Sequence, residues 1–309
     1  MRDFSLSNSG LKMSVEAFGP DNIELKKIKI SDSNEKVSIP VDHEVATGDN
    51  AVISLPHLTE SSETRNIDVE LSYNTGDLEN ITATGSITGN IGFDQSLRGY
   101  WTMKENQANS THVYDISGNS NNGLLDNPQV GEKDTIFNGE NDRVEAGYEW
   151  TSNPEFSIIF EVVSTRDYDE SEYDQENIMR EVSTDTGYFS FEIRNSSEGR
   201  YLYLVTRSTN DGELLSVGTT FDSFEKRDKI FGALRVNGEE VSLTTNESHR
   251  YYTDTRDDKA WNFNNILLAQ PRWPGNREYL NGTMSNIQVY NRYLSELEVE
   301  SIKDSELIS

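Results

Sequence analysis

The chain has 309 residues, of which 34% are hydrophobic, and its 54 acidic and 27 basic side chains give a formal net charge of −27. A surface this acidic is repelled by nucleic-acid phosphates and anionic lipid headgroups, so neither is expected as a partner. The absence of cysteine excludes disulfides, thiolate metal sites and cysteine nucleophiles.

The acidic excess is present in the first 95 residues and in the remainder, so it coats the protein and is not a tail. It fits an ordinary acidic protein, or one adapted to very high salt, where a Debye length of about 3 Å at 1 M screens self-repulsion. We favour the halophilic interpretation. No run approaches the roughly 20 apolar residues that span a bilayer, so no membrane insertion is expected. The first ten residues lack the apolar core of a secretion signal, so export is either not encoded here or depended on a removed leader.

Residues 1–95 alternate apolar and polar side chains over short runs, with turn signals about every ten residues and no helical period. The runs begin at Leu11, Ile23, Lys36, Asn50, Asn66 and Asn80. This spacing predicts an immunoglobulin-like β-sandwich, to which we assign assembly or docking. The Ser/Thr-rich final strands loosely resemble the heads of archaeal pilin-type surface proteins, although no specific motif is shared.

We expect the boundary near residues 93–97 and a second domain over residues 96–309. Residues 156–164 form a nearly continuous apolar run, which predicts a central strand covered on both faces. Further strands are predicted at 188–193, 201–207, 230–236, 241–245, 266–269 and 282–290, with a hairpin signal at Asn237 and Gly238. Residues 295–303 predict a short helix capped by Ser295.

Two distant segments carry the most specific pattern in the chain. Residues 113–145 read VYDISGNSNNGLLDNPQVGEKDTIFNGENDRVE, and residues 279–302 read YLNGTMSNIQVYNRYLSELEVESI. Together with Tyr100 and Trp101, this pattern resembles the laminin-G-like, concanavalin A-like lectin and glucanase family over residues 97–303. The resemblance implies a jelly-roll sandwich in which the two segments meet.

Members of this family often hold one structural Ca²⁺ near the opening loop, and the resemblance implies Asp115, Asn119, Asn122 and Asp142 as ligands. Calcium takes six to eight oxygens, including carboxylates. The closing strand departs from the family because Asn286 follows Met284 and Ser285 where the family commonly has a carboxylate. The alternative is that these side chains only build turns.

Residues 167–176 read DYDESEYDQE and invite a second metal hypothesis. They lack the ligand spacing of an EF-hand loop, so we expect a solvated acidic loop.

A glycan site needs a flat aromatic platform beside polar groups that fix hydroxyls. The candidates on predicted loops are Tyr251, Tyr252, Trp261, Phe263, Arg272 and Trp273. Trp273 lies between two prolines and beside Arg272, so its backbone is held rigidly. It either contacts a ligand or packs over the edge of the sandwich.

The sequence offers little that is specific to catalysis. Glucanases of this fold place paired carboxylates on one strand as ExDxE or ExDxxE. Glu172, Asp174 and Glu176 match the first spacing and Glu140, Asp142 and Glu145 the second, but they fall in the acidic stretch expected to be a solvated loop and in the turn-rich opening segment. The four histidines form no HExxH spacing, and no GxSxG or Gly-rich phosphate loop is present. We therefore expect no enzyme.

The sequence predicts an all-β protein: an immunoglobulin-like β-sandwich over 1–95, then a concanavalin A-like, laminin-G-like jelly roll over 96–309. We expect a non-catalytic surface protein of a halophilic virus or microbe, in the first place a virion appendage such as a capsid turret, tail spike or fibre. Its partners would be a host surface glycan or glycoprotein, other structural subunits and further copies of itself. The alternatives are a cell-surface or pilus-borne adhesin, and a polysaccharide-processing enzyme or its carbohydrate-binding accessory domain.

Overall fold

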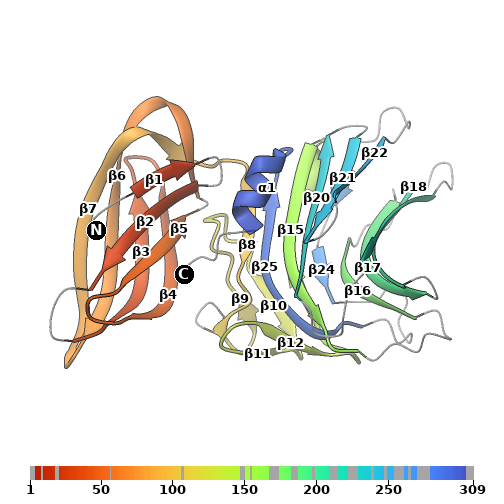
Figure 1. Cartoon of the computed structure of the whole chain (residues 1–309), viewed down its shortest axis with the longest axis horizontal. Coiled ribbons are helices and arrows are strands. Elements are labelled where there is room, and N and C mark those ends of the chain that lie inside the picture. Colours follow the sequence, from red (N-terminus) through yellow and green to blue (C-terminus); the bar gives the residue numbers. More distant parts are fainter. Residues whose placement is uncertain are drawn as a thin grey trace. The chain divides into compact units, whose positions relative to one another are not determined.

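The structure is a computed structural model, and it describes most of the chain. The described residues are 4–7, 10–17, 21–55, 57–105, 108–146, 150–153, 155–166, 174–181, 187–196, 199–208, 214–221, 229–237, 240–246, 249–253, 261–263, 266–269 and 279–303. They form antiparallel sheets and one α-helix, so the predicted all-β class is confirmed (Figure 1). None of the described helical segments is long and apolar enough to cross a bilayer.

The chain divides into two compact units. Unit 1 comprises Met1–Leu97, Ile116–Asn119 and Leu294–Ser309, and unit 2 comprises Arg98–Asp115 and Ser120–Tyr293. The boundary expected from the sequence, after residue 95, lies two residues before the point where the chain first enters unit 2.

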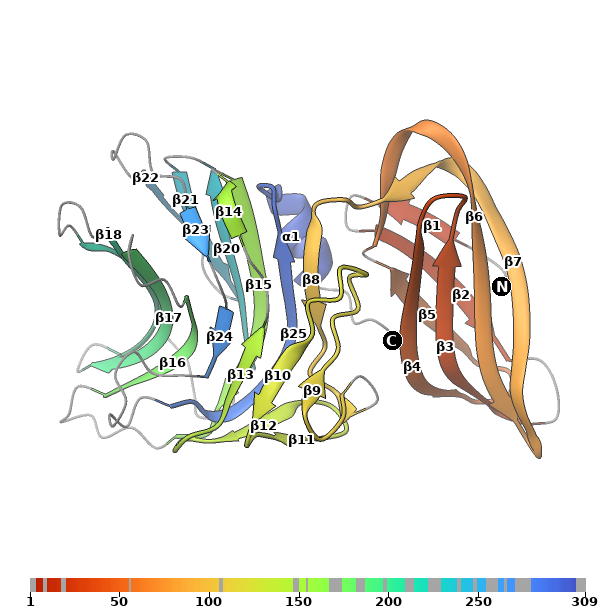
Figure 2. The same ribbon diagram turned by 180° about the vertical axis from the view of Figure 1, so that it is seen from behind.

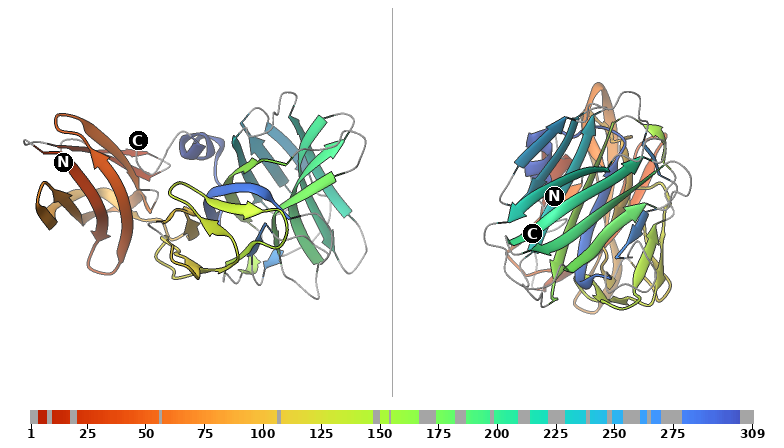
Figure 3. Two further views of the ribbon diagram at one scale, coloured as in Figure 1. Left: turned by 90° about the horizontal axis from the view of Figure 1, so that it is seen from below. Right: turned by 90° about the vertical axis from the view of Figure 1, so that its right-hand side faces the viewer.

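Unit 1 is a sandwich of two antiparallel sheets. Its strands are β1 (Phe4–Ser7), β2 (Gly10–Glu16), β3 (Ile23–Ser31), β4 (Lys36–Val45), β5 (Asn50–Leu55), β6 (Leu58–Thr75) and β7 (Leu78–Phe93). One sheet has the order β1-β2-β5 and the other the order β4-β3-β6-β7, and the left view of Figure 3 shows these red-to-orange strands from below. Buried residues alternate along β3 and along part of β6, as with Ile28 and Ile30 on β3 and Ile67 and Val69 on β6, because successive strand residues face opposite sides of a sheet.

Unit 2 contains the remaining strands, most of them in two eight-stranded sheets. They are β8 (Leu97–Trp101), β9 (His112–Val113), β10 (Gly123–Asp126), β11 (Gln129–Val130), β12 (Thr135–Asn138), β13 (Arg143–Ala146), β14 (Trp150–Asn153), β15 (Glu155–Ser164), β16 (Asp174–Glu181), β17 (Gly187–Ser196), β18 (Gly199–Ser208), β19 (Leu214–Phe221), β20 (Lys229–Asn237), β21 (Glu240–Thr245), β22 (His249–Thr253), β23 (Trp261–Phe263), β24 (Ile266–Leu268) and β25 (Asn281–Tyr290).

One sheet of unit 2 has the order β19-β18-β17-β16-β24-β13-β10-β9, and the other has the order β11-β12-β25-β15-β20-β21-β22 with β8 also paired to β25. β14 and β23 form a separate pair. Figure 1 shows the layer containing β15, β20 and β25 opposite the layer containing β16, β17 and β18. Aromatic side chains pack between the layers, where the rings of Phe160 and Phe191 meet edge to face at 4.9 Å between centroids.

The opening and closing segments meet as the sequence pattern implied. β12 pairs with β25, with Phe137 opposite Gly282 and Asn138 opposite Asn281. β25 pairs in turn with β15, the apolar run predicted to be central, and β20 covers the other edge of β15. The jelly roll is therefore closed by strands that are more than a hundred residues apart in the sequence.

The described helix, α1 (Glu296–Lys303), has the predicted cap. The Glu298 backbone N–H donates to the Ser295 hydroxyl at 3.3 Å, and the Glu298 carboxylate accepts the Ser295 backbone N–H at 2.7 Å. This reciprocal pair is a capping box. Val299 and Ile302 form the buried side of the helix.

Candidate functional site

The aromatic residues predicted to bind glycan all belong to one stretch of unit 2, residues 249–273, which we call the crossing segment. It begins on β22, the edge strand of one sheet, continues through β23 and reaches β24 inside the other sheet (Figure 2). Trp261 lies on β23, opposite Asn153 of β14. Arg272 and Trp273 lie outside the described residues.

Tyr251 and Tyr252 occupy neighbouring positions on β22. Tyr251 is opposite Ser242, and Tyr252 is opposite Val241. Adjacent strand positions alternate between the two faces of a sheet, so these two positions belong to opposite faces. This register therefore does not place both tyrosine positions on one face, as a single flat platform would require.

The predicted calcium loop is held by its own side chains. The Asp115 carboxylate accepts the backbone N–H of Tyr100 on one oxygen and that of Asn121 on the other, both at 2.9 Å. The Asn122 side-chain oxygen accepts the Asp115 backbone N–H at 3.0 Å. The Asn121 amide donates to the Arg98 carbonyl, and the Trp101 indole donates to the Asn121 carbonyl at 2.8 Å. These hydrogen bonds support the alternative in which the side chains of this loop build turns.

Asp142 lies at a different place in the same sheet. Asp115 follows β9 beside the Gly123 end of β10, whereas Asp142 precedes β13 at the Asp126 end. Three strand steps between those ends span about 10 Å. The register therefore places Asp115 and Asp142 at opposite ends of β10.

The environment of Asp142 is unusual for a carboxylate. The side chain is 4% exposed, and one oxygen accepts the Asn138 backbone N–H at 2.8 Å. The other oxygen is buried and has no hydrogen-bond partner in the part of the chain that the structure describes. Burial raises the pKa of Asp142, and the nearby Glu140 and Asp126 carboxylates add to this effect.

The only part of the acidic stretch 167–176 that the structure describes is a strand, so the expected solvated loop is wrong for residues 174–176. Glu176 on β16 is completely buried. Its carboxylate accepts the Ser164 hydroxyl at 2.6 Å and the Asn281 backbone N–H at 2.9 Å, and Arg166 approaches within 3.5 Å. Burial of an acid is tolerable here because polar donors surround it. Residues 167–173 lie outside the described residues.

A second polar group, missed from the sequence, lies on β15 and β25. Glu161 forms an ion pair with Lys229 at 3.0 Å and accepts the Ser285 hydroxyl at 3.2 Å and the Asn286 side-chain amide. Asn286 has a positive φ of 51°, which interrupts the strand and accompanies a register shift between β15 and β25. The only sequence signal was a charged residue inside the apolar run of β15.

Next to this group, Gln288 joins two tyrosine hydroxyls. The Tyr290 hydroxyl donates to the Gln288 side-chain oxygen at 2.7 Å, and Tyr100 also bonds to Gln288. All three side chains are buried. Burial raises the pKa of the Tyr100 hydroxyl, with a contribution from the Glu161 charge.

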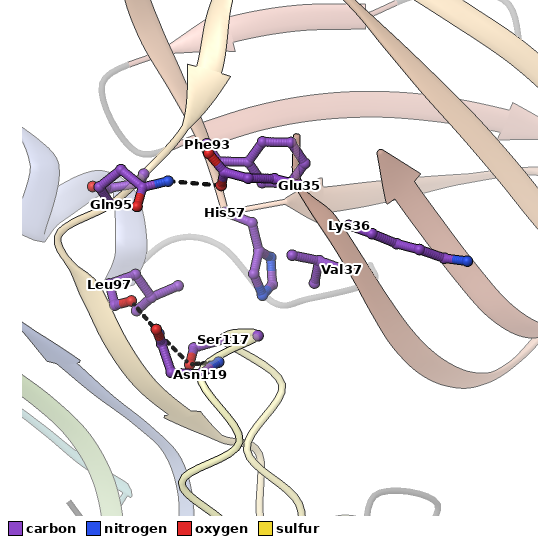
Figure 4. Close-up of a pocket in the computed structure, with 11 residues that line it drawn as sticks. Glu35, Lys36, Val37, His57, Phe93, Gln95, Leu97, Ser117 and Asn119 are labelled. Carbon is purple, nitrogen blue, oxygen red and sulfur yellow. Dashed lines mark hydrogen bonds between the residues drawn. The ribbon is translucent and has the colours of Figure 1, made fainter. Parts of the chain in front are cut away.

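Unit 1 contains a small hollow beside residues 116–119 (Figure 4). The buried His57 ring donates from Nε2 to the Ile116 carbonyl at 2.6 Å, and the Asn119 amide donates to the Leu97 carbonyl at 2.9 Å. The volume is about 140 Å³, below the few hundred Å³ typical of small-molecule sites. These two hydrogen bonds hold residues 116–119 in place, so we assign the residues around the hollow a structural role.

No group of three or more His, Asp or Glu side chains arranged to hold a metal ion is found within the described ranges. In these ranges the acids noted above lie apart, each engaged by its own donors: Asp115 by backbone N–H groups, Glu161 by Lys229 and Glu176 by Ser164.

Comparison with known proteins adds structural likeness only. No protein-family model matches the sequence, and no curated protein sequence matches it. Among solved structures, the chain is similar to the binding domain of botulinum neurotoxin serotype D, with a TM-score of 0.54 and 12% identity over 68% of this chain and 51% of that one. It is also similar to the receptor-binding domain of the mosaic serotype C/D toxin, with a TM-score of 0.51 and 13% identity over 68% and 50%. The binding domain of botulinum neurotoxin serotype G gives a TM-score of 0.50 and 13% identity over 67% of this chain and 50% of that one. The chain spans about half the length of these structures, and the likeness supports an all-β sandwich fold.

Proposed function

We propose that this chain is a non-catalytic recognition protein in which the jelly roll of unit 2 binds a surface glycan or glycoprotein. The observation that carries the proposal is that Tyr251, Tyr252 and Trp261 lie on β22 and β23, in the stretch between β22 of one sheet and β24 of the other. These three candidates were expected on loops and lie on strands instead. Arg272 and Trp273 follow this stretch in the sequence.

Two further observations support recognition. The solved structures similar to this chain include domains described as toxin binding and receptor-binding domains. Glu161 is partly buried and is held by Lys229 of β20 and Ser285 of β25, and Glu176 is fully buried and is held by Ser164 of β15 and the Asn281 N–H of β25. These two carboxylates are therefore engaged in contacts that stabilise the sandwich.

The finer form of the proposal is a laminin-G-like head on a virion appendage, working at high salt at the virion or cell surface. It is supported by the sequence pattern of the opening and closing segments and by the net charge of −27. An adhesin on a cell surface or pilus is the second candidate, favoured by the same features. Oligomers observed on virions would favour the first, and a membrane anchor in the full gene would favour the second.

A structural calcium ion remains a prediction for the opening loop, where Asp115 and Asn122 are the pair that the fold brings together. If calcium binds there, adding Ca²⁺ to protein dialysed against chelator raises the thermal unfolding temperature by mass action. Mg²⁺ at the same concentration is the control, because it prefers smaller, stricter geometry. Equal effects of the two ions would contradict a calcium site.

A glycan array probed at high salt tests the recognition proposal. We expect wild-type protein to bind a subset of glycans and Trp273→Ala to lose at least about tenfold in affinity, since an aromatic platform contributes one to a few kcal/mol. Leu124→Ser is the matched control, because Leu124 is 48% exposed on β10. Equal binding by wild type and Trp273→Ala, or no binding by either, refutes the site.

Incubation with polysaccharides tests the rival enzymatic function. Turnover that is abolished by changing one carboxylate would overturn the non-catalytic proposal.

A further inference from the structure

The four-stranded sheet of unit 1 ends in a long, open edge. β7 (Leu78–Phe93) has 16 residues and pairs with β6 along one side. No described strand pairs with its other side, and β7 is the outermost strand of its sheet in both Figure 1 and Figure 2. An edge of this kind presents unpaired backbone N–H and C=O groups that can accept another strand.

The opposite edge of the same sheet is protected. β4 carries Pro40 and the charged residues Lys36, Asp42 and Glu44, which are the usual means of preventing strand addition. β7 has no proline, and its one charged residue, Glu79, is the second residue of the strand. Two edges of one sheet therefore differ in the feature that decides whether a further strand can add.

The uncharged run of β7 covers residues 80–93, which is exceptional in a chain with 26% charged residues. Its solvent face is formed by small polar side chains that are all exposed: Thr82, Thr84, Ser86, Thr88 and Asn90. The charges of this face gather on the neighbouring strands, where Lys29 of β3 pairs with Glu70 of β6. β7 itself therefore presents no charge to a second molecule between residues 80 and 93, and the nearest acids, Asp68 and Glu70, lie one strand back on β6, opposite Ser86 and Thr84.

We propose that β7 is a self-association edge, at which β7 of a second copy of this chain adds in antiparallel orientation to join the two four-stranded sheets. Two identical strands that pair antiparallel are related by a two-fold axis, so the interface is self-complementary. We place the two-fold axis at Ser86, in the middle of the row of exposed hydroxyl side chains, so that Ser86 is opposite Ser86 of the second copy and Thr84 is opposite its Thr88. Such hydroxyl pairs across antiparallel strands are favourable.

The charge of the whole chain then makes association depend on salt. Each copy carries −27, so the two copies repel each other at a distance. Screening shortens the Debye length from about 10 Å at 0.1 M to about 3 Å at 1 M, and the dimer is expected to strengthen over that range. This behaviour is opposite to that of an interface held by ion pairs.

A cysteine introduced at the two-fold axis tests the pairing directly, because the chain has no cysteine of its own. In Ser86→Cys, opposed residues would lie about 4.5–5.5 Å apart, within the range of a disulfide. A paired thiol has a millimolar effective concentration, so at about 10 µM protein we expect cross-linking roughly 100-fold faster than a collisional control.

Two controls define the result. Ser38→Cys is exposed on the protected edge β4, and Thr82→Cys is exposed on β7 but is opposite Asn90 in the proposed register. Both control variants are expected to cross-link slowly. Ser86→Cys is expected to cross-link faster at 1 M than at 0.1 M NaCl. Circular dichroism checks that all variants are folded. The proposal is overturned if Ser86→Cys is no faster than Ser38→Cys, or if Thr82→Cys cross-links as fast. Glycan binding by unit 2 is scored separately, so either proposal can fail alone.

Discussion

Single carboxylates that accept backbone N–H groups hold the turns of this protein. Asp32 follows β3 and accepts the N–H groups of Asn34 at 2.7 Å and Glu35 at 2.8 Å. Its second oxygen forms an ion pair with Arg65 at 3.2 Å. In unit 2, the Asp115 carboxylate likewise accepts the backbone N–H groups of Tyr100 and Asn121. Carboxylates used in this way belong to the stability of the fold, even where their spacing in the sequence suggests a metal.

Asp32 gives a prediction at the residue scale. The N–H of Asn34 first, then the N–H of Glu35 and the Arg65 charge, hold the pKa of Asp32 below its usual value. A depressed carboxyl pKa contributes stability that is present above the unfolded pKa of about 4 and is lost as pH falls through the folded pKa. Asp32→Ala should lower the free energy of unfolding at pH 7 by about 1–3 kcal/mol, measured by urea denaturation.

The cost of Asp32→Ala should shrink as the pH falls below about 4, because the carboxyl of the unfolded chain binds a proton there while the folded one stays ionised to lower pH. Asp32→Asn is the matched control, because it keeps one acceptor oxygen and cannot titrate. A cost that is equal at pH 7 and pH 3.5 would show that the charge contributes nothing.

At the scale of elements, β15 and β25 approach so closely that a side chain is excluded between them. A Cβ on Gly282 would lie 1.9 Å from the Val163 carbonyl oxygen. That oxygen belongs to the backbone of the central strand, so it cannot move aside without breaking the β15–β25 ladder. The glycine in the closing segment is therefore needed for sheet closure.

We predict that Gly282→Ala lowers the free energy of unfolding by about 3 kcal/mol or more, since overpacking that moves backbone is among the most costly substitutions. Gly89→Ala on β7 is the control, because a Cβ there meets nothing within 4 Å, and we expect a change within about 1 kcal/mol. Urea denaturation of both variants measures the difference. Similar small effects would mean that the closing strand can shift.

The cap of α1 gives a second prediction for an element. Ser295→Ala removes the hydroxyl that accepts the Glu298 N–H, which should cost about 0.5–2 kcal/mol. Leu297→Ala on the same helix removes a side chain that is 74% exposed and should change little. Thermal unfolding of the two variants compares them. An equal loss in the two variants would show that the Ser295 hydroxyl contributes no more than an exposed side chain of the same helix.

For the whole molecule, the excess of acids sets the response to salt. Repulsion among the charges of a −27 chain opposes the compact state, and it is largely screened at about 1 M salt. We predict that the unfolding temperature rises by several degrees between about 0.1 and 1 M NaCl. Sucrose at matched osmolality is the control for exclusion effects. A flat response to NaCl, or an equal response to sucrose, contradicts the halophilic interpretation.

Local patterns in the sequence were sufficient for some elements of the fold, but not for β16, which was expected to be an acidic loop, nor for β22 and β23, whose aromatic residues were expected on loops. β3 has the bounds of the alternating run that predicted it, β15 is the central strand indicated by its apolar run, and α1 begins after Ser295. These features depend on neighbours within one or two turns or strand steps, so a single sequence contains them. The meeting of β12 and β25 required the resemblance of two distant motifs.

The tertiary structure alone decided how residues far apart share an environment. It buried Glu176 beside Ser164 and Asn281, and it separated Asp115 from Asp142 at opposite ends of β10. It also left β7 at the margin of its sheet. Strand order and register come from pairing between distant segments, and alternation along one strand carries no information about which strand lies beside it. The sequence thus determined the strands that have regular alternation or a long apolar run, and the pairing determined which polar groups are buried, separated or exposed.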